Sequence, residues 1–169
     1  THPSRFRLIK IFNPHSESVN DEIVRWAETP GVVGARLDTR SPSFEADDPG
    51  LNRILASAAE VGIPVNVMCS GNLPLFRELA IRHPNTQLVV DHLGLTQPHF
   101  PPVPSKPFSD LGNVISLAAC DNVAIKISGS CTLSHHPFPY PDIWEPLTSI
   151  FDAFGLERCM WGTDWTRAV

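Results

Sequence analysis

Several features that mark particular classes of protein are missing from this sequence of 169 residues. No uninterrupted apolar run approaches the roughly 18 residues of a membrane span, so no membrane partner is expected. The 13 lysines and arginines are scattered among 18 acidic residues, and the net charge of −5 argues against a nucleic-acid partner. No CxxC pair occurs among the 4 cysteines, which argues against a structural zinc site and is typical of reduced thiols in a cytoplasmic protein.

Proline, by contrast, is abundant, with 17 residues of this type. Many of them fall in two stretches, 95–108 and 135–142, which predict two long and stiffened loops. Loops of this length in a compact domain usually carry function, so we expect both to shape a substrate pocket. His135 and His136, in the second stretch, are candidates for lining that pocket.

Strand-like and helix-like segments alternate along the whole chain. Strands are predicted over 5–12, 32–38, 63–69, 86–94, 122–129 and 157–165. Helices are predicted over 19–28, 47–62, 73–84, 109–120 and 141–155. The second of these helices, for example, has apolar residues at the three- and four-residue spacing of a buried helix face. Strands separated by helices in this way indicate repeated βαβ units and a parallel sheet.

A parallel sheet can be open or closed. An open doubly wound sheet of the nucleotide-binding kind would carry a glycine-rich turn after its first strand, and the segment IFNPHSES (11–18) is not such a turn. A (β/α)₈ barrel fits better, because polar residues follow strand after strand, and that rim is the active-site face of a barrel. A whole barrel needs eight strands and about 250 residues. We therefore expect residues 1–169 to form one partial TIM-barrel domain of about six βα units, truncated at both ends.

Two polar residues follow apolar strands directly. His92 comes after Leu88–Asp91, and Asp164 comes after residues 160–163. Both are expected at the barrel mouth as candidates for catalysis. Two alternatives remain: His92 could hydrogen-bond a neighbouring loop, and Asp164 could cap a short turn.

Two cationic residues lie inside predicted strands. Lys126 and Ser128 share one strand face, because alternate side chains point the same way. Lys126 must be paired, either at the mouth or with a carboxylate such as Asp164 or Asp91. Arg36 could hold a substrate carboxylate in a bidentate contact, or pair internally with Asp38 or another neighbouring acid.

Three segments together resemble a known family: VVDHLG, NVAIKISG and ERCMWGTDW, in this order. They are similar to the last three strands of the amidohydrolase-2 family. The likeness is greatest to its lactonase-like branch, which includes 2-pyrone-4,6-dicarboxylate and sugar lactonases. The segments TPGVVGARLD, AAEVGIPVNV and FRLIKIFNP resemble the three preceding strands. The resemblance spans nearly the whole chain, which would then correspond to strands 3 to 8 of the family barrel.

The resemblance implies a hydrolase that opens a lactone or related cyclic ester of a small carboxylate or sugar acid. Asp164 would be the base that activates water, and His92 would polarise the scissile carbonyl. Lys126 would assist in stabilising the oxyanion, while Arg36 and Ser128 would orient the substrate. Trp165, beside Asp164, is a further candidate for substrate binding.

The resemblance also bears on cofactors. Metal-dependent members usually carry a histidine at the end of strand 5, where this sequence has Met68, Cys69 and Ser70. This departure fits a branch that hydrolyses without a metal, so no metal ligand is assigned. A divalent zinc or manganese ion is expected only if the HxH pair of strand 1 is present upstream. The alternatives are a metal-dependent decarboxylase of an aromatic or conjugated acid, and an inactive fragment. The oligomeric state is not indicated.

Overall fold

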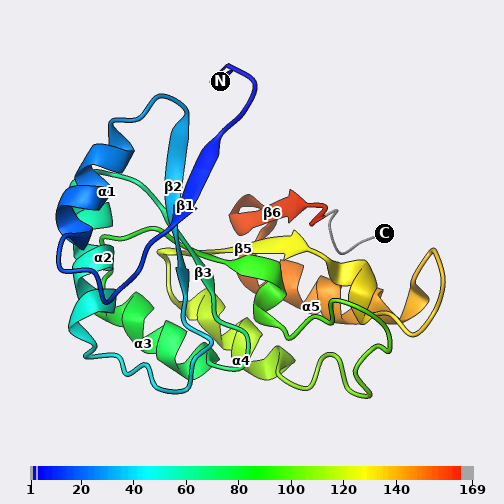
Figure 1. Cartoon of the computed structure of the whole chain (residues 1–169). Helices are drawn as coiled ribbons and strands as arrows, with labels where there is room; N and C mark the ends of the chain where they lie inside the picture. The colour runs from blue at the N-terminus through cyan, green and yellow to red at the C-terminus, as the bar shows by residue number, and fades with distance from the viewer. Residues whose placement is uncertain (1, 3, 165–169) are drawn as a thin grey trace.

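The computed structural model describes residue 2 and residues 4–164, and its six strands form one parallel sheet (Figure 1). The strands are β1 (Leu8–Ile11), β2 (Val32–Asp38), β3 (Val65–Met68), β4 (Leu88–Val90), β5 (Val123–Ser128) and β6 (Cys159–Gly162). Their order in the sheet is their order in the chain. A doubly wound sheet reverses its strand order at a switch point, so the observed order excludes that alternative.

Helices connect the strands and lie along the outside of the curled sheet (Figure 1). They are α1 (Val19–Ala27), α2 (Pro49–Glu60), α3 (Leu73–Arg82), α4 (Leu111–Ser116) and α5 (Trp144–Phe154). All six predicted strands and five predicted helices are therefore present, in the predicted order. Among the described residues, none of the helices combines the length and the apolar character that crossing a bilayer requires.

The core lies between the helices and the outer face of the sheet. Along β5, Val123, Ile125 and Ile127 are buried, whereas Ala124 and Lys126 between them are half-buried. This alternation follows from the two-residue period of a strand and assigns one face of the sheet to the helices. Each fully buried aliphatic side chain of this core contributes about 1.5–3 kcal/mol of transfer free energy.

The opposite, inner face of the sheet is lined by a different set of residues. A hollow of about 450 Å³ lies against it, with Asn66, Val89, Ala124, Lys126 and Met160 among its lining residues. Parallel register aligns Arg36 with Asn66, Asn66 with Val89, and Val89 with Ala124. The inner face thus carries side chains from neighbouring strands in matched rows, as the interior of a barrel does.

The ends of several elements differ from those predicted. The predicted strand 86–94 ends at Val90, because residues 91–94 leave the sheet in a tight turn, η1 (Asp91–Gly94), whose central residues are not helical. The predicted helix 109–120 is an α-helix only over Leu111–Ser116, followed by the 3₁₀ turn η2 (Leu117–Ala119). The predicted strand 157–165 is a strand only over Cys159–Gly162. The turn after β4 is the difference that matters for the site.

Candidate active site

A buried carboxylate, that of Asp91, lies at the carboxyl end of β4. Its side chain is fully buried, and it directly follows β4. Arg36 Nη2 lies 2.8 Å from Asp91 Oδ2, and Lys126 Nζ lies 3.0 Å from Asp91 Oδ1. Asn66 Nδ2 donates a hydrogen bond of 3.2 Å to Asp91 Oδ1. We call these four residues the Asp91 hub; they come from β2, β3, β5 and the end of β4.

The Asp91 hub shows which acid pairs with Arg36 and Lys126, which the sequence left open. Both form internal ion pairs, and both share Asp91 as their partner. Asp38, the other acid considered for Arg36, is paired instead with Arg40, whose Nε donates to Asp38 Oδ1 at 2.8 Å. That hydrogen bond holds the pKa of Asp38 below its usual value. Asp91 neutralises one of the two positive charges, so the ion pairs leave one charge for a substrate. Substrate contact by Arg36 and Lys126 therefore stays a prediction.

His92, Ser128 and Asp164 meet at the carboxyl end of the sheet, as expected from their positions after or at the end of strands. His92 Nδ1 lies 3.1 Å from Ser128 Oγ and 3.4 Å from Asp164 Oδ2. The His92 and Asp164 side chains are each 17% exposed, so a small molecule can reach them while most of their surface is desolvated. The fold therefore brings an imidazole, a hydroxyl and a carboxylate together at one point of the rim. Trp165, the remaining predicted residue, lies outside the described residues.

The turn that carries His92 is unusual. His92 (φ 53°), Leu93 (φ 63°) and Gly94 (φ 67°) are consecutive residues in the left-handed region, and Asp164 (φ 47°) is also there. For a residue with a Cβ atom this conformation costs about 1–2 kcal/mol. Such outliers concentrate at functional sites because surrounding contacts hold them in place. The backbone at both His92 and Asp164 is therefore strained where the two side chains meet.

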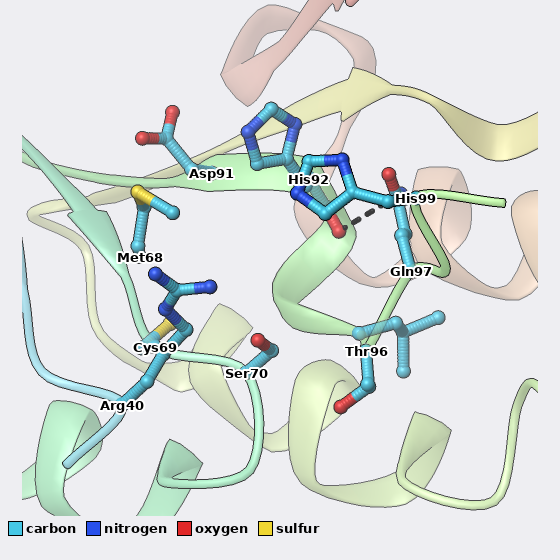
Figure 2. A pocket seen from close by; sticks show the side chains of 10 residues that line it. Arg40, Met68, Cys69, Ser70, Asp91, His92, Thr96, Gln97 and His99 are labelled. Atoms are coloured by element: carbon cyan, nitrogen blue, oxygen red, sulfur yellow. Dashed lines mark hydrogen bonds between the residues drawn. The ribbon is translucent and has the colours of Figure 1, made fainter. Parts of the chain in front are cut away.

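A cavity of about 80 Å³ opens beside His92. Its polar lining comes from Arg40, Ser70, Asp91, His92, Thr96, Gln97 and His99. Figure 2 shows the rings of His92 and His99 on one side of the cavity, and Met68, Cys69 and Arg40 on the other. His135 and His136 are not among the lining residues. Of the two proline-rich loops, only the first contributes to the described lining of the cavity, through Leu95, Thr96, Gln97 and His99.

The donor set does not by itself suit a metal ion. Within residues 4–164 no three His, Cys, Asp or Glu side chains are grouped as metal ligands would be. Cys69 is fully buried, and burial raises the pKa of its thiol, which disfavours the thiolate form that binds metals. His92 and Asp164 supply two donors, whereas a zinc site takes three or four protein ligands. By themselves, the described residues thus supply fewer donors than a zinc site uses.

Three residues that build this site were not among the predicted site residues: Asp91, Asn66 and Gln97. Asp91 had a signal, because an acid ends the apolar run of β4 immediately before His92; the sequence indicates it as a polar residue of the rim and as a partner for Lys126. Asn66 had a weaker one, as a polar residue within an otherwise apolar strand. Gln97 had none, because it lies in a proline-rich loop whose path cannot be predicted from composition.

Comparison with known proteins places this geometry among related folds. The model of the amidohydrolase family Amidohydro_2 matches residues 1–167. The 4-sulfomuconolactone hydrolase of Rhizobium radiobacter is 27% identical over 164 residues, covering 96% of this chain and 53% of the relative. The L-fucono-1,5-lactonase of Burkholderia ambifaria is 35% identical over 151 residues, covering 85% of this chain and 49% of the relative. The chain therefore spans about half the length of the curated relatives it matches.

A solved structure agrees on the fold. A zinc-bound amidohydrolase from Burkholderia multivorans superposes with a TM-score of 0.75 at 22% identity, covering 94% of this chain and 58% of that one. The predicted fold class, a partial (β/α)₈ barrel, is confirmed by this likeness and by the sequential, curled sheet.

Proposed function

This chain belongs to the amidohydrolase family, and from that premise we propose that the protein hydrolyses a lactone of a small organic or sugar acid. Two of its relatives, a muconolactone hydrolase and a sugar lactonase, are named for cyclic esters, and this supports a small-molecule lactone as substrate. The observation that carries the proposal is the meeting of His92, Ser128 and Asp164 at the carboxyl rim of the sheet.

Hydrolysis of a lactone requires a base for water and a donor for the developing oxyanion. In the proposed reaction Asp164 accepts a proton from a water molecule, and the water oxygen bonds to the lactone carbonyl carbon. The carbonyl oxygen gains negative charge, which the His92 imidazole stabilises by donating a hydrogen bond from Nε2–H. The ring C–O bond then breaks, the alcohol oxygen takes up the proton that Asp164 accepted from water, and a hydroxy acid is released.

The roles of the neighbouring groups follow from their contacts. Ser128 Oγ and Asp164 Oδ2 both face Nδ1 of His92, and together they orient the imidazole. The Asp91 hub holds two cations around one carboxylate beneath this rim. Its excess positive charge favours an anionic transition state and the carboxylate product.

Replacing Asp164 by asparagine in the full-length protein tests the assignment of the base. General base catalysis contributes about 10²–10⁴-fold, so kcat for L-fucono-1,5-lactone or 4-sulfomuconolactone should fall by about that factor. Asp152→Asn, at an exposed position of α5, serves as a control and should keep normal turnover. Near-normal turnover of Asp164→Asn would show that Asp164 is not the base.

We propose further that the reaction needs no metal ion, on the strength of the buried Cys69 thiol and the two-donor set at the rim. Metal analysis of the full-length protein, followed by an assay after chelation, tests this. Stoichiometric zinc or manganese, with activity lost on chelation, would contradict it and favour the decarboxylase alternative. We also expect a cytoplasmic location, which the four free thiols support.

A further inference from the structure

The side chain of Gln97 links the turns that follow β4 and β5. Its Nε2 donates hydrogen bonds to the backbone oxygen of His92 (3.2 Å) and to that of Ser128 (2.8 Å). Figure 2 shows Gln97 beside the His92 turn, with the first of these bonds drawn as a dashed line. Gln97 is 9% exposed, although it lies in a loop. A single amide group therefore bonds the backbones of two residues whose side chains meet at 3.1 Å.

The position of Gln97 depends on a glycine. Gly129 follows Ser128 with a φ of +67°, and a Cβ atom built there would lie 2.2 Å from Gln97 Oε1. No other residue type leaves this space free while tolerating the left-handed backbone. The close approach of Gln97 to the β5 turn thus requires Gly129.

The buried amide oxygen of Gln97 indicates that this residue does more than stabilise the fold. Within the described part of the chain its Oε1 is buried and accepts no hydrogen bond. A buried acceptor of this kind is unfavourable, and an apolar side chain of the same size would fill the space without that cost. What glutamine supplies and an apolar residue cannot is the NH₂ group that holds the two carbonyl oxygens.

We propose that Gln97 is a positioning residue, which acts through His92 and Ser128 and makes no contact with the reacting atoms. The left-handed backbone of His92 is unfavourable by about the amount that one or two hydrogen bonds contribute. Releasing the His92 oxygen would let this turn relax and would withdraw the imidazole from Ser128 and Asp164. This inference rests on the proposed function, because it assigns Gln97 to the same site.

Gln97→Leu in the full-length protein tests the proposal, because leucine keeps the volume and removes both donors. We expect kcat, measured per folded molecule, to fall by about tenfold while KM changes by less than about twofold, the pattern of a lost transition-state interaction. In a Ser128→Ala background the same change should lower kcat by less than about threefold, because coupled residues are not additive. The proposal would be overturned if Gln97→Leu lowered kcat by the same factor in the wild-type and Ser128→Ala proteins, or left kcat unchanged.

Gly129→Ala is a second variant that displaces the amide of Gln97 without altering Gln97 itself. It should reproduce the loss of kcat. Gly62→Ala is the matched control, because Gly62 has a similar φ of +70° but no atom within 4 Å of the added Cβ. The control should lower stability slightly and leave kcat unchanged. Loss of stability without loss of kcat in Gly129→Ala would show a purely structural role.

A spectroscopic measurement separates failure of this inference from failure of the proposed function. The imidazole ¹⁵N shifts of His92 report its contact with Ser128 whether or not a lactone is hydrolysed. They should move in Gln97→Leu in the direction seen in Ser128→Ala. If the wild-type protein hydrolyses no lactone but the shifts move, the proposed function fails and the positioning role stands; unchanged shifts overturn that role.

Discussion

Replacing Asp91 by asparagine should be the most destabilising single change to the inner face of the sheet. Asparagine keeps the size of the side chain and can still accept the hydrogen bond from Asn66. It removes the negative charge that faces Arg36 and Lys126 at 2.8 and 3.0 Å. Two cations then lie in a largely desolvated interior without a counter-charge.

The expected magnitude follows from the burial of the three partners. Removing one partner of a buried ion pair costs about 3–5 kcal/mol. The Asp91 side chain is fully buried, whereas those of Arg36 and Lys126 keep 28% and 22% of their exposure. Water can therefore relieve part of the penalty, and we expect the lower end, about 3 kcal/mol. With a slope of about 2 kcal/mol per M urea, the unfolding midpoint should fall by about 1.5 M.

Two comparisons make the urea experiment decisive. Asp38→Asn removes the carboxylate of the exposed Asp38–Arg40 pair and should cost no more than about 1 kcal/mol. Adding Lys126→Met to Asp91→Asn should recover part of the lost stability, because one uncompensated cation disappears. If Asp91→Asn costs no more than Asp38→Asn, the hub does not hold the strands together.

Three further predictions concern other parts of the molecule. Burial raises the pKa of the Cys69 thiol, so iodoacetamide at about pH 8 should modify it only after unfolding in urea; rapid labelling of Cys69 in the native protein, located by mass spectrometry of its peptide, would contradict this. Burial and a neighbouring arginine lower the pKa of His83 below its usual 6.5. The unfolded chain then binds the proton more readily, so the unfolding free energy should fall as pH drops below 6.5, and His83→Gln should flatten that part of the curve. A Cβ at Gly50 would lie 1.9 Å from the backbone oxygen of Pro14, whereas Gly112 has no atom within 4 Å. Gly50→Ala should therefore lower the thermal midpoint, and Gly112→Ala, in a helix, should raise stability by about 0.5–1 kcal/mol.

The elements of this fold could be predicted because their signals are local. Apolar spacing along 47–62 reflects the helix face that packs on the sheet, and Asp48 caps that helix by accepting from Leu51 N at 2.9 Å. The end of β4 could not be predicted in the same way. Gly94 is the residue of its turn whose type most favours a left-handed backbone, whereas the type of Leu93 gives no such signal. The contacts of His92 with Ser128 and Gln97, which are not local, cannot be read from the sequence.

The candidate site was predictable to the extent that it depends on the ends of strands. His92 and Asp164 follow β4 and β6, and parallel strands bring their carboxyl ends to one rim. The partner of a charged residue depends instead on register, which the sequence does not display. Alternation predicts that Lys126 and Ser128 share one strand face, but the sequence leaves Asp164 and Asp91 as alternative partners, and the structure pairs Lys126 with Asp91.

Register and charge also support each other in this sheet. Side chains alternate between the two faces of a strand, so a slip of one residue would turn an inward side chain toward the helices. For β4 such a slip would move Asp91 into the apolar core and leave Arg36 and Lys126 unpaired on the inner face, a double penalty of buried charge. The apolar residues of β4 do not distinguish the two registers, because Leu88, Val89 and Val90 are all buried although they point to both faces of the sheet. The charges of the Asp91 hub therefore disfavour the slipped register of β4, which its apolar residues alone would not disfavour. The observed register, selected in this way, also brings His92 beside Ser128.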